Sequence, residues 1–247
     1  MAPRFAGQVG RFIRPVYLGP VPALAEAPAL PSGILHGDCV TVMATLPAAS
    51  IDLVLTDPPY GCNYRDRAGR RVANDNRTDW LEPAFAGVAR LMKPDSVCVS
   101  FYGWHVVDQF MAAWRAAGLK PVAHLVFPKR YASRVGTFEA RHEQAYVLTN
   151  GNPRVPSPIA DVLPWAYTGN RLHPTQKPTE ALAPIIAALT RPGDLVLDPF
   201  AGSGSTLVAA QQLGRRFIGI ELDAGHAATA IARLARETGR RKCQAIG

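Results

Sequence analysis

The stretch Leu195-Val-Leu-Asp-Pro-Phe-Ala-Gly-Ser-Gly-Ser-Thr206 decides the fold class of this chain. Its apolar first half is typical of a short buried strand, and its last residues open a helical pattern. The glycines between them allow a tight turn, bring the backbone close to a ligand and leave the first N–H groups of a helix free to donate. The stretch therefore predicts a strand, a ligand-binding turn and a helix.

Three kinds of ligand suit a glycine turn of this type, and the neighbouring residues argue against two of them. A phosphate cradle for ATP needs a lysine after the second glycine, and none follows Gly204. A dinucleotide fingerprint needs a third glycine where Leu207 stands. The remaining ligand is a nucleoside without a pyrophosphate. Glu221, at the end of the next apolar run, could accept hydrogen bonds from the ribose hydroxyls of such a ligand. An ordinary strand-to-helix turn without a ligand stays open as the alternative.

Short apolar runs alternate with helical patterns on both sides of this stretch. Seven runs are expected to form strands: 34–36, 51–56, 97–101, 121–127, 144–148, 195–198 and 217–221. Helices are expected at 106–114, from Pro178 to about Thr190, and after Asp223 as the N-cap. Several runs are rich in Val, Ile and Leu without polar alternation, as parallel strands covered on both faces are. The pattern predicts an α/β three-layer sandwich with a mainly parallel sheet.

Composition and charge narrow the class of protein. The 247 residues are 48% hydrophobic and 19% charged, which excludes a disordered chain, a collagen-like repeat and a coiled coil. No run reaches the roughly 18 apolar residues of a membrane-spanning helix. The net charge of +8 favours a polyanionic partner such as nucleic acid. Four scattered cysteines argue against a disulfide framework or a zinc site and favour a reducing cytoplasm.

The chain is expected to form one catalytic domain, residues 33–247, after an irregular N-terminal extension at 1–32. Two loops, 61–79 and 150–171, resist assignment to a helix or a strand. The first carries several arginines, and the second is rich in Pro and Gly. Loops beyond the carboxyl ends of the strands form the ligand crevice of an open α/β sheet. Both loops are therefore expected to face the ligand, and they would face DNA if the polyanionic partner is DNA.

A second motif, Ile51-Asp-Leu-Val-Leu-Thr-Asp-Pro-Pro-Tyr60, ends another apolar run in an acid, two prolines and an aromatic ring. The prolines lack N–H groups, so the backbone of this turn presents carbonyl acceptors without the donors that other residues would add. With the Asp57 carboxylate and the flat face of Tyr60, they suit a planar amine such as the exocyclic NH₂ of a nucleobase. A rigid turn with Tyr60 in the core is the alternative, and it leaves Asp57 unexplained.

The segments Asp57–Tyr60 and Asp198–Thr206 together resemble the amino-methylating DNA methyltransferases that use S-adenosylmethionine. The order of the two motifs is similar to that of the beta subclass of this family. Three further segments extend the match across about residues 34–223: His36–Cys39, His173–Pro178 and Gly219–Asp223. The resemblance implies a Rossmann-like fold with a seven-stranded sheet, one reversed strand and a circularly permuted motif order.

The resemblance also implies roles for individual residues. The target base would be held by the catalytic residues Asp57, Pro58, Pro59 and Tyr60. Among the cofactor residues, Glu221 would hold the ribose, Asp38 the cofactor's adenine, and Lys177 the methionine carboxylate. The complete cofactor set implied by the resemblance is Asp38, Thr175, Gln176, Lys177, Asp198, Phe200, Ala201, Gly202, Ser203, Gly204 and Glu221. No metal is expected.

The reaction implied is methyl transfer to the N6 amine of an adenine flipped out of duplex DNA. Asp57 and the Pro58 carbonyl would accept the two protons of the amine, and positioning would supply much of the acceleration. An acid at the head of the motif is more typical of adenine enzymes than of N4-cytosine enzymes, which tend to carry serine, so N4-cytosine is the alternative. RNA, a protein amide and a non-catalytic nucleic-acid-binding module are more remote alternatives.

Basic side chains near the second motif are candidates for phosphate contacts. The set consists of Arg65, Arg67, Arg70 and Arg71 in the first loop, with Lys129 and Arg130 further along the chain. A solvated surface loop is an equal alternative for the arginines. The segment before His173 is short for a target-recognition insert, so recognition could be relaxed or assisted by a partner subunit in a homodimer.

The remaining expectations concern location and packing. The protein is expected in the cytoplasm, associated with the nucleoid through DNA and not with a membrane. Trp104, Trp114 and Trp165 are expected to be packing residues, and Arg233 is expected on a solvated helix face.

Overall fold

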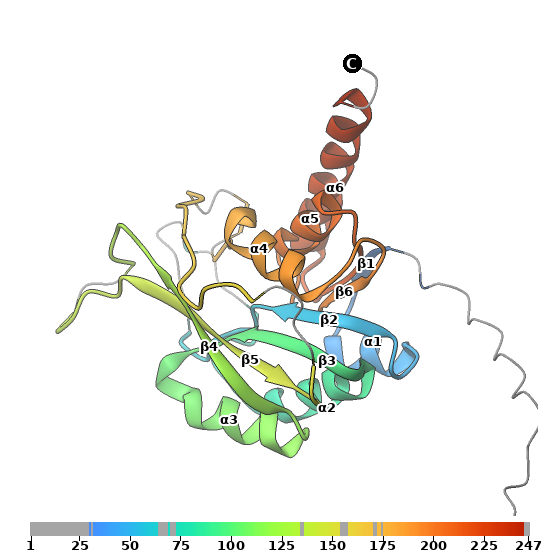
Figure 1. The fold of residues 1–247 in the computed structure, drawn as a ribbon. Helices are drawn as coiled ribbons and strands as arrows, with labels where there is room; N and C mark the ends of the chain where they lie inside the picture. Colours follow the sequence, from blue (N-terminus) through green and yellow to red (C-terminus); the bar gives the residue numbers. More distant parts are fainter. Residues whose placement is uncertain are drawn as a thin grey trace, which may run out of the picture. The chain divides into compact units, whose positions relative to one another are not determined.

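A seven-stranded sheet forms the centre of the computed structural model of the chain (Figure 1). The structure describes residues 30, 32–63, 69, 73–133, 136–153, 158–169, 172–173 and 175–244, with side chains up to residue 239. The strands of this part of the chain are β1 (Gly33–His36), β2 (Ile51–Thr56), β3 (Met92–Phe101), β4 (Lys120–Pro128), β5 (His142–Thr149), β6 (Leu195–Asp198) and β7 (Arg216–Glu221). Their order across the sheet is β1-β7-β6-β2-β3-β5-β4.

One strand runs against the others. The pairs from β1 through β7, β6 and β2 to β3 are all parallel. Strand β5 is antiparallel to both of its neighbours, β3 and β4. The mainly parallel seven-stranded sheet with one reversed strand is therefore confirmed.

Helices cover both faces of the sheet, which confirms the three-layer sandwich (Figure 1). On one face α1 (Cys39–Thr45) packs on α2 (Leu81–Leu91), and α2 packs on α3 (Val107–Ala116). On the other face α5 (Ser205–Gln212) lies between α4 (Thr179–Leu189) and α6 (Ala224–Gln244). A short 3-10 turn, η1 (Trp104–Val106), precedes α3. None of the described helices combines the length and the apolar character needed to cross a membrane.

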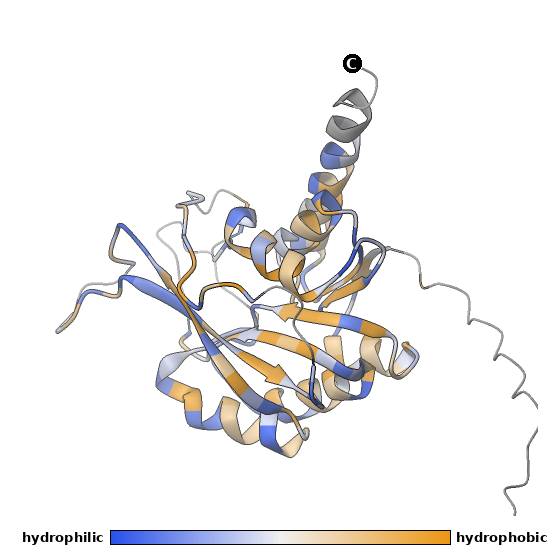
Figure 2. Ribbon diagram, viewed as in Figure 1, coloured by the Kyte–Doolittle hydropathy of each residue, from blue (hydrophilic) through white to orange (hydrophobic). Residues whose placement is uncertain are grey.

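Burial on both faces explains why the central strands lack polar alternation. Successive residues of a strand point to opposite faces, yet Leu53, Val54 and Leu55 of β2 are all fully buried. Every residue of β6 is also buried. Helix α2 buries one face at helical spacing, through Leu81, Ala84, Phe85, Val88 and Leu91. Figure 2 shows the resulting concentration of apolar residues along the central strands and on the inward sides of the helices.

The observed elements differ from the sequence prediction at β3. This strand begins at Met92, where helix α2 ends, and not at Val97. Met92 already pairs with Ile51 of β2, and the polar residues that follow it hide this pairing from a search for apolar runs. Helix α2 itself was not predicted. The extension predicted at 1–32 lies almost entirely outside the described residues, as do parts of the two loops.

The parallel strands bring both sequence motifs to one edge of the sheet. Strands β2 and β6 are direct neighbours, with Leu53 opposite Val196 and Val54 opposite Leu197. The second motif leaves the carboxyl end of β2, and the glycine turn leaves the carboxyl end of β6. This edge is where open α/β sheets bind ligands.

Candidate active site

An open cleft of about 2160 Å³ at this edge is lined by residues of both motifs. Pockets for single drug-sized ligands measure roughly 300 to 1,000 Å³, so the cleft has room for two ligands side by side. Eleven of the predicted catalytic and cofactor residues line it: Asp38, Asp57, Pro58, Pro59, Tyr60, Thr175, Gln176, Lys177, Phe200, Gly202 and Glu221. The structure thus brings together residues from five separate segments of the chain.

A smaller cavity of about 40 Å³ joins the two motifs more closely. Asp57 and Lys177 line it together with Gly202 and Ser203. Asp198 and Ala201 also contribute to its wall. The Asp57 side chain therefore lies on the same side of the sheet as the glycine turn.

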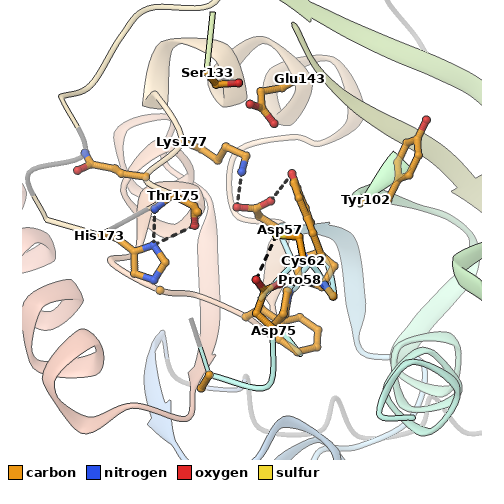
Figure 3. A pocket seen from close by; sticks show the side chains of 18 of the residues that line it. Asp57, Pro58, Cys62, Asp75, Tyr102, Ser133, Glu143, His173, Thr175 and Lys177 are labelled. Atoms are coloured by element: carbon orange, nitrogen blue, oxygen red, sulfur yellow. Dashed lines mark hydrogen bonds and ion pairs between the residues drawn. The ribbon is translucent and has the colours of Figure 1, made fainter. Parts of the chain in front are cut away.

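The Asp57 carboxylate is held by two side-chain donors (Figure 3). The Tyr60 hydroxyl donates to Oδ1 at 2.9 Å, and the Lys177 ammonium donates to Oδ2 at 2.5 Å. The side chains of Asp57 and Lys177 are only 19% and 8% exposed. Burial raises the pKa of Asp57 above its ordinary value, although the Lys177 cation acts against that rise. Burial, and then the Asp57 charge, raise the pKa of the Tyr60 phenol.

Gly103 fixes the backbone of the second motif. A Cβ atom at this position would lie 2.5 Å from the Tyr60 carbonyl oxygen and 2.9 Å from the Tyr60 Cβ. The loop after β3 therefore packs directly on the turn that presents Asp57 and Tyr60. Only glycine allows this approach without displacing the turn.

The glycine turn orients a second carboxylate. Gly202 and Gly204 have positive φ angles of 51° and 80°, a region that favours glycine. The Gly202 N–H donates to Glu221 Oε2 at 2.7 Å, and the Asp223 N–H donates to Oε1 at 2.8 Å. Two backbone amides thus fix the Glu221 carboxylate in the wall of the cleft. Gly204 packs on helix α6, because a Cβ there would lie 2.9 Å from the Ala230 Cβ.

Two further predicted acids have structural partners at this edge. Asp38 caps helix α1, because its Oδ1 accepts from the Thr41 N–H at 3.0 Å, and it also lines the cleft. Asp198 is buried under the glycine turn, where its Oδ1 accepts from the Thr56 hydroxyl at 3.0 Å and the Phe200 N–H at 3.1 Å. Burial raises the pKa of Asp198 to about 7.

The segment that contains Thr175, Gln176 and Lys177 lies between the two motifs. The Thr175 N–H and hydroxyl lie 3.3 and 3.2 Å from His173 Nδ1. The His173 ring lies over Gly202, where a Cβ atom would approach it to 3.4 Å. The structure places the Lys177 ammonium on Asp57, a contact that the sequence did not predict.

The candidate DNA-contacting residues fall into three groups. Arg65, Arg67, Arg70 and Arg71 lie outside the described residues. Arg130 is exposed. Lys129, predicted as a phosphate contact, lines the cleft, but its side chain is 1% exposed and forms a 2.6 Å ion pair with Glu143. A buried, paired ammonium cannot reach a phosphate unless that ion pair is broken.

Two residues behave differently from their sequence prediction. Trp104 lines the cleft and is 72% exposed, although it was expected to be a packing residue. Arg233 was expected on a solvated face, but its guanidinium donates to the Ser203 carbonyl at 2.6 Å. Its position three residues after Ala230, which lies on the inner face of α6, was the available signal.

Comparison with known proteins identifies the class to which this fold and site belong. A solved structure of M1.HpyAVI in complex with S-adenosylmethionine superposes with a TM-score of 0.65 and 25% identity, covering 82% of this chain and 98% of that one. The PvuII DNA methyltransferase, described as cytosine-N4-specific, gives a TM-score of 0.68 at 18% identity, covering 84% and 90%. The fold is that of the S-adenosylmethionine-dependent DNA methyltransferases.

Sequence relatives narrow this class to a family. YubD of Escherichia coli K12, a protein named as a methylase, is 55% identical over 192 residues, which cover 77% of this chain and 85% of YubD. The DNA adenine methyltransferase YhdJ of the same organism is 30% identical over 241 residues, covering 81% and 82%. A family model described as DNA methylase matches residues 158–232. The chain belongs to the N6/N4 DNA methyltransferase family, whose members use S-adenosylmethionine.

The residues at the glycine-turn end of the cleft fit this cofactor. Gly202 has a φ of 51° and carries no side chain, so a ligand can approach the backbone of the turn closely. Glu221 offers a carboxylate that two backbone amides already orient, and each of its oxygens keeps a second lone pair. A ribose diol needs acceptors of this kind.

Proposed function

We propose that this DNA methyltransferase methylates the exocyclic N6 amine of an adenine flipped out of duplex DNA. The observation that carries the proposal is that Asp57 and the glycine turn line the same small cavity. A flipped base held at Asp57 would therefore lie within reach of a cofactor held at the turn. A base inside the duplex could not enter such a cleft.

On the cofactor side, the proposed contacts are those of the glycine turn and its neighbours. S-adenosylmethionine supplies an electrophilic methyl group on its sulfonium. Glu221 would accept from the ribose hydroxyls, and Asp38 from the amino group of the cofactor's adenine. Asp198 would support the cofactor site indirectly, because its buried carboxylate accepts from the Phe200 N–H and so fixes the start of the turn.

On the base side, Asp57 and the Pro58 carbonyl would accept the two protons of the target amine. The lone pair of this amine is delocalised into the ring, and hydrogen bonds to both protons favour the pyramidal, nucleophilic form. Positive charge develops on the nitrogen as the methyl group arrives, and a carboxylate in a poorly solvated cleft stabilises it strongly. Tyr60 would provide a flat surface for the base.

Two observations support adenine over cytosine as the target base. The motif begins with the acid Asp57, where N4-cytosine enzymes tend to carry serine. YhdJ, which is 30% identical over 241 residues, is named as a DNA adenine methyltransferase. The likeness to the cytosine-specific PvuII enzyme, at 18% identity, concerns the fold alone. Nucleoside mass spectrometry of DNA methylated by the purified protein tests the proposal, which requires N6-methyladenine and is contradicted by N4-methylcytosine.

Replacement of the acceptor tests the catalytic assignment. Asp57→Ala should lower methyl transfer to plasmid DNA by at least about 1,000-fold, because the charge that stabilises the transition state is lost. The dissociation constant for S-adenosylmethionine, measured by calorimetry, should change by less than about threefold, because Asp57 acts on the base side of the cleft. Turnover near the wild-type rate in this variant would refute the role of Asp57. Parallel assays on duplex DNA and on RNA of the same sequence test the choice of nucleic acid.

A further inference from the structure

We propose that Lys177 is a positioning residue for Asp57: its ammonium group orients the carboxylate and compensates its charge while the target amine is bound. The cofactor carboxylate is then not its partner. The inference rests on the proposed function of Asp57, and it concerns a contact between residues 120 positions apart in the chain.

The geometry fixes both oxygens of the Asp57 carboxylate. Lys177 Nζ reaches Oδ2 from the segment before α4, and the Tyr60 hydroxyl reaches Oδ1 from the motif itself. Two donors from different directions prevent the carboxylate from rotating. Each oxygen has two lone pairs and uses one of them, so both can still accept an N–H from the substrate. The contacts therefore orient Asp57 without blocking it.

The surroundings of Lys177 also favour a lasting pair. Its side chain is 8% exposed, and Nζ lies 5.3 Å from the centre of the Tyr60 ring and 5.1 Å from that of Phe101. The faces of aromatic rings stabilise a buried cation. An ammonium group in so dry a place requires an acidic partner, and Asp57 Oδ2 at 2.5 Å supplies it.

The charge balance of the site depends on this pair. The groups that act on Asp57 are Lys177, Tyr60 and Glu143, and Glu143 is itself paired with Lys129. The neighbouring carboxyl is Asp198, and the Tyr131 phenol also lies within the influence of Lys177. Among these, Lys177 is the cation that makes direct contact with Asp57. Without it, burial and the Glu143 charge would both favour the protonated acid.

The test is the neutral variant Lys177→Met, with Lys177→Arg as the conservative one. In Lys177→Met the pKa of Asp57 rises further, so a larger share of the enzyme carries a protonated Asp57 at pH 7. A protonated carboxyl loses acceptor capacity for the amine. Turnover of plasmid DNA should fall by about 100-fold at pH 7, the usual cost of losing one preorganised electrostatic contact. The acid limb of the kcat profile should move to higher pH, so that activity recovers as the pH is raised.

Two further readouts separate positioning from a general loss of structure. Lys177→Arg should return the acid limb towards its wild-type position. The dissociation constant for S-adenosylmethionine should stay within about twofold in Lys177→Met, since the pair acts on the base side of the cleft. Lys93→Met is the matched control, because it removes the lysine of another Lys–Asp pair, between Lys93 of β3 and Asp52 of β2, away from the cleft. It should leave kcat and its pH profile unchanged.

Each outcome decides the inference. A kcat profile that does not move in Lys177→Met overturns it, and so does cofactor binding weakened tenfold or more. Should Lys177→Met fail to fold in a thermal melt, Lys177→Gln, which keeps a neutral donor, carries the same comparison. Asp57→Ala distinguishes the two levels of the argument. An active Asp57→Ala would overturn the role of Asp57 in the proposed function, whereas an inactive one beside an unaffected Lys177→Met would overturn only the role of Lys177.

Discussion

An aspartate near each end of strand β2 pairs with a lysine from another segment, Asp52 with Lys93 and Asp57 with Lys177, and the two pairs serve different purposes. At the amino end, Asp52 Oδ1 accepts from Lys93 at 2.6 Å, and Oδ2 accepts from the Leu195 N–H at 2.9 Å. The second contact joins β2 to the first residue of β6. The Lys93 side chain is 44% exposed, so water already solvates part of this pair. Asp52 therefore has a structural role, because it holds β2 and β6 together.

At the carboxyl end, both partners of Asp57 are side chains, Lys177 and Tyr60, and no backbone group of a neighbouring strand is among the partners described. Side-chain partners can adjust when a ligand enters, whereas a backbone amide in a sheet cannot. Lys177 is also much less exposed than Lys93, whereas the two aspartate side chains are exposed to a similar extent. The same two residue types thus support structure at one end of β2 and chemistry at the other, because only the carboxyl ends of the strands face the cleft.

Asp198, at the carboxyl end of β6, is a third aspartate to compare with Asp52 and Asp57. Its titration is expected to have the largest effect on the free energy of unfolding. Its folded-state pKa of about 7 lies above the ordinary value of 3.8 for an aspartate, because burial disfavours the charge. Between these values the folded protein holds a proton that the unfolded chain has released, so the free energy of unfolding decreases as the pH rises from about 4 to 7. The loss should reach about 4 kcal/mol at most.

Asp198→Asn removes this titration and keeps an oxygen that can accept from Thr56 and Phe200. Urea unfolding at pH 5 and pH 8 should show a smaller decrease in stability for the variant than for the wild type. Equal decreases in both proteins would mean that Asp198 is not a carboxyl strained by burial. The comparison with β2 would then rest on Asp57 alone.

Gly103→Ala should break the carboxyl end of β2 and leave the amino end intact. The added Cβ would lie 2.5 Å from the Tyr60 carbonyl oxygen, so the turn that presents Asp57 must move. A displacement of about 1 Å at a catalytic group can cost about 100-fold in rate, and a loss of that size is expected in kcat. Gly33→Ala is the matched control, because its Cβ would meet no atom within 4 Å. A Gly103→Ala enzyme with wild-type turnover would show that the turn tolerates displacement.

The two ends of β2 also differ in how far the sequence could predict them. The bounds of β2 and β6 follow from their unbroken apolar runs, and both were predicted as observed. The start of β3 was missed, because Lys93, Pro94 and Asp95 interrupt the apolar pattern while the pairing of Met92 with Ile51 sets the strand. Local pattern is sufficient where burial is uniform, and it fails where pairing across the sheet decides.

The same limit applies to the site. Asp57, Gly202 and Glu221 could be singled out because each belongs to a short motif with a recognisable purpose. The pairing of Lys177 with Asp57 spans 120 positions, and no local signal connects the two residues. Lys129 was predicted from the sequence as a phosphate contact, and only the fold reveals Glu143 beside it. Charged residues acquire partners through topology, which a single sequence does not display.

Asp52→Ala tests the structural end of β2. Removal of the carboxylate leaves the Leu195 N–H without this acceptor and Lys93 without its partner. The free energy of unfolding should fall by about 2 kcal/mol, as expected for a partly buried hydrogen bond to a charged group. Lys93→Ala should cost less than about 1 kcal/mol, because the lysine is well exposed. The kcat of folded Asp52→Ala should equal that of the wild type, and a loss comparable to that of Asp57→Ala would abolish the distinction between the two ends.

The smallest expected effect concerns the cofactor side of the cleft. Arg233 Nη1 donates to the Ser203 carbonyl at 2.6 Å and lies 3.3 Å from the Ser205 hydroxyl, so helix α6 holds the glycine turn from behind. Arg233→Ala should loosen the turn and weaken binding of S-adenosylmethionine by roughly fivefold, or about 1 kcal/mol, measured by calorimetry. Arg236→Ala removes an equal charge from the exposed side of the same helix and should leave the affinity unchanged. The kcat at saturating cofactor should not change in either variant, because Asp57 and Lys177 remain in place. A loss of kcat in Arg233→Ala would show that the glycine turn and the Asp57–Lys177 pair do not act independently.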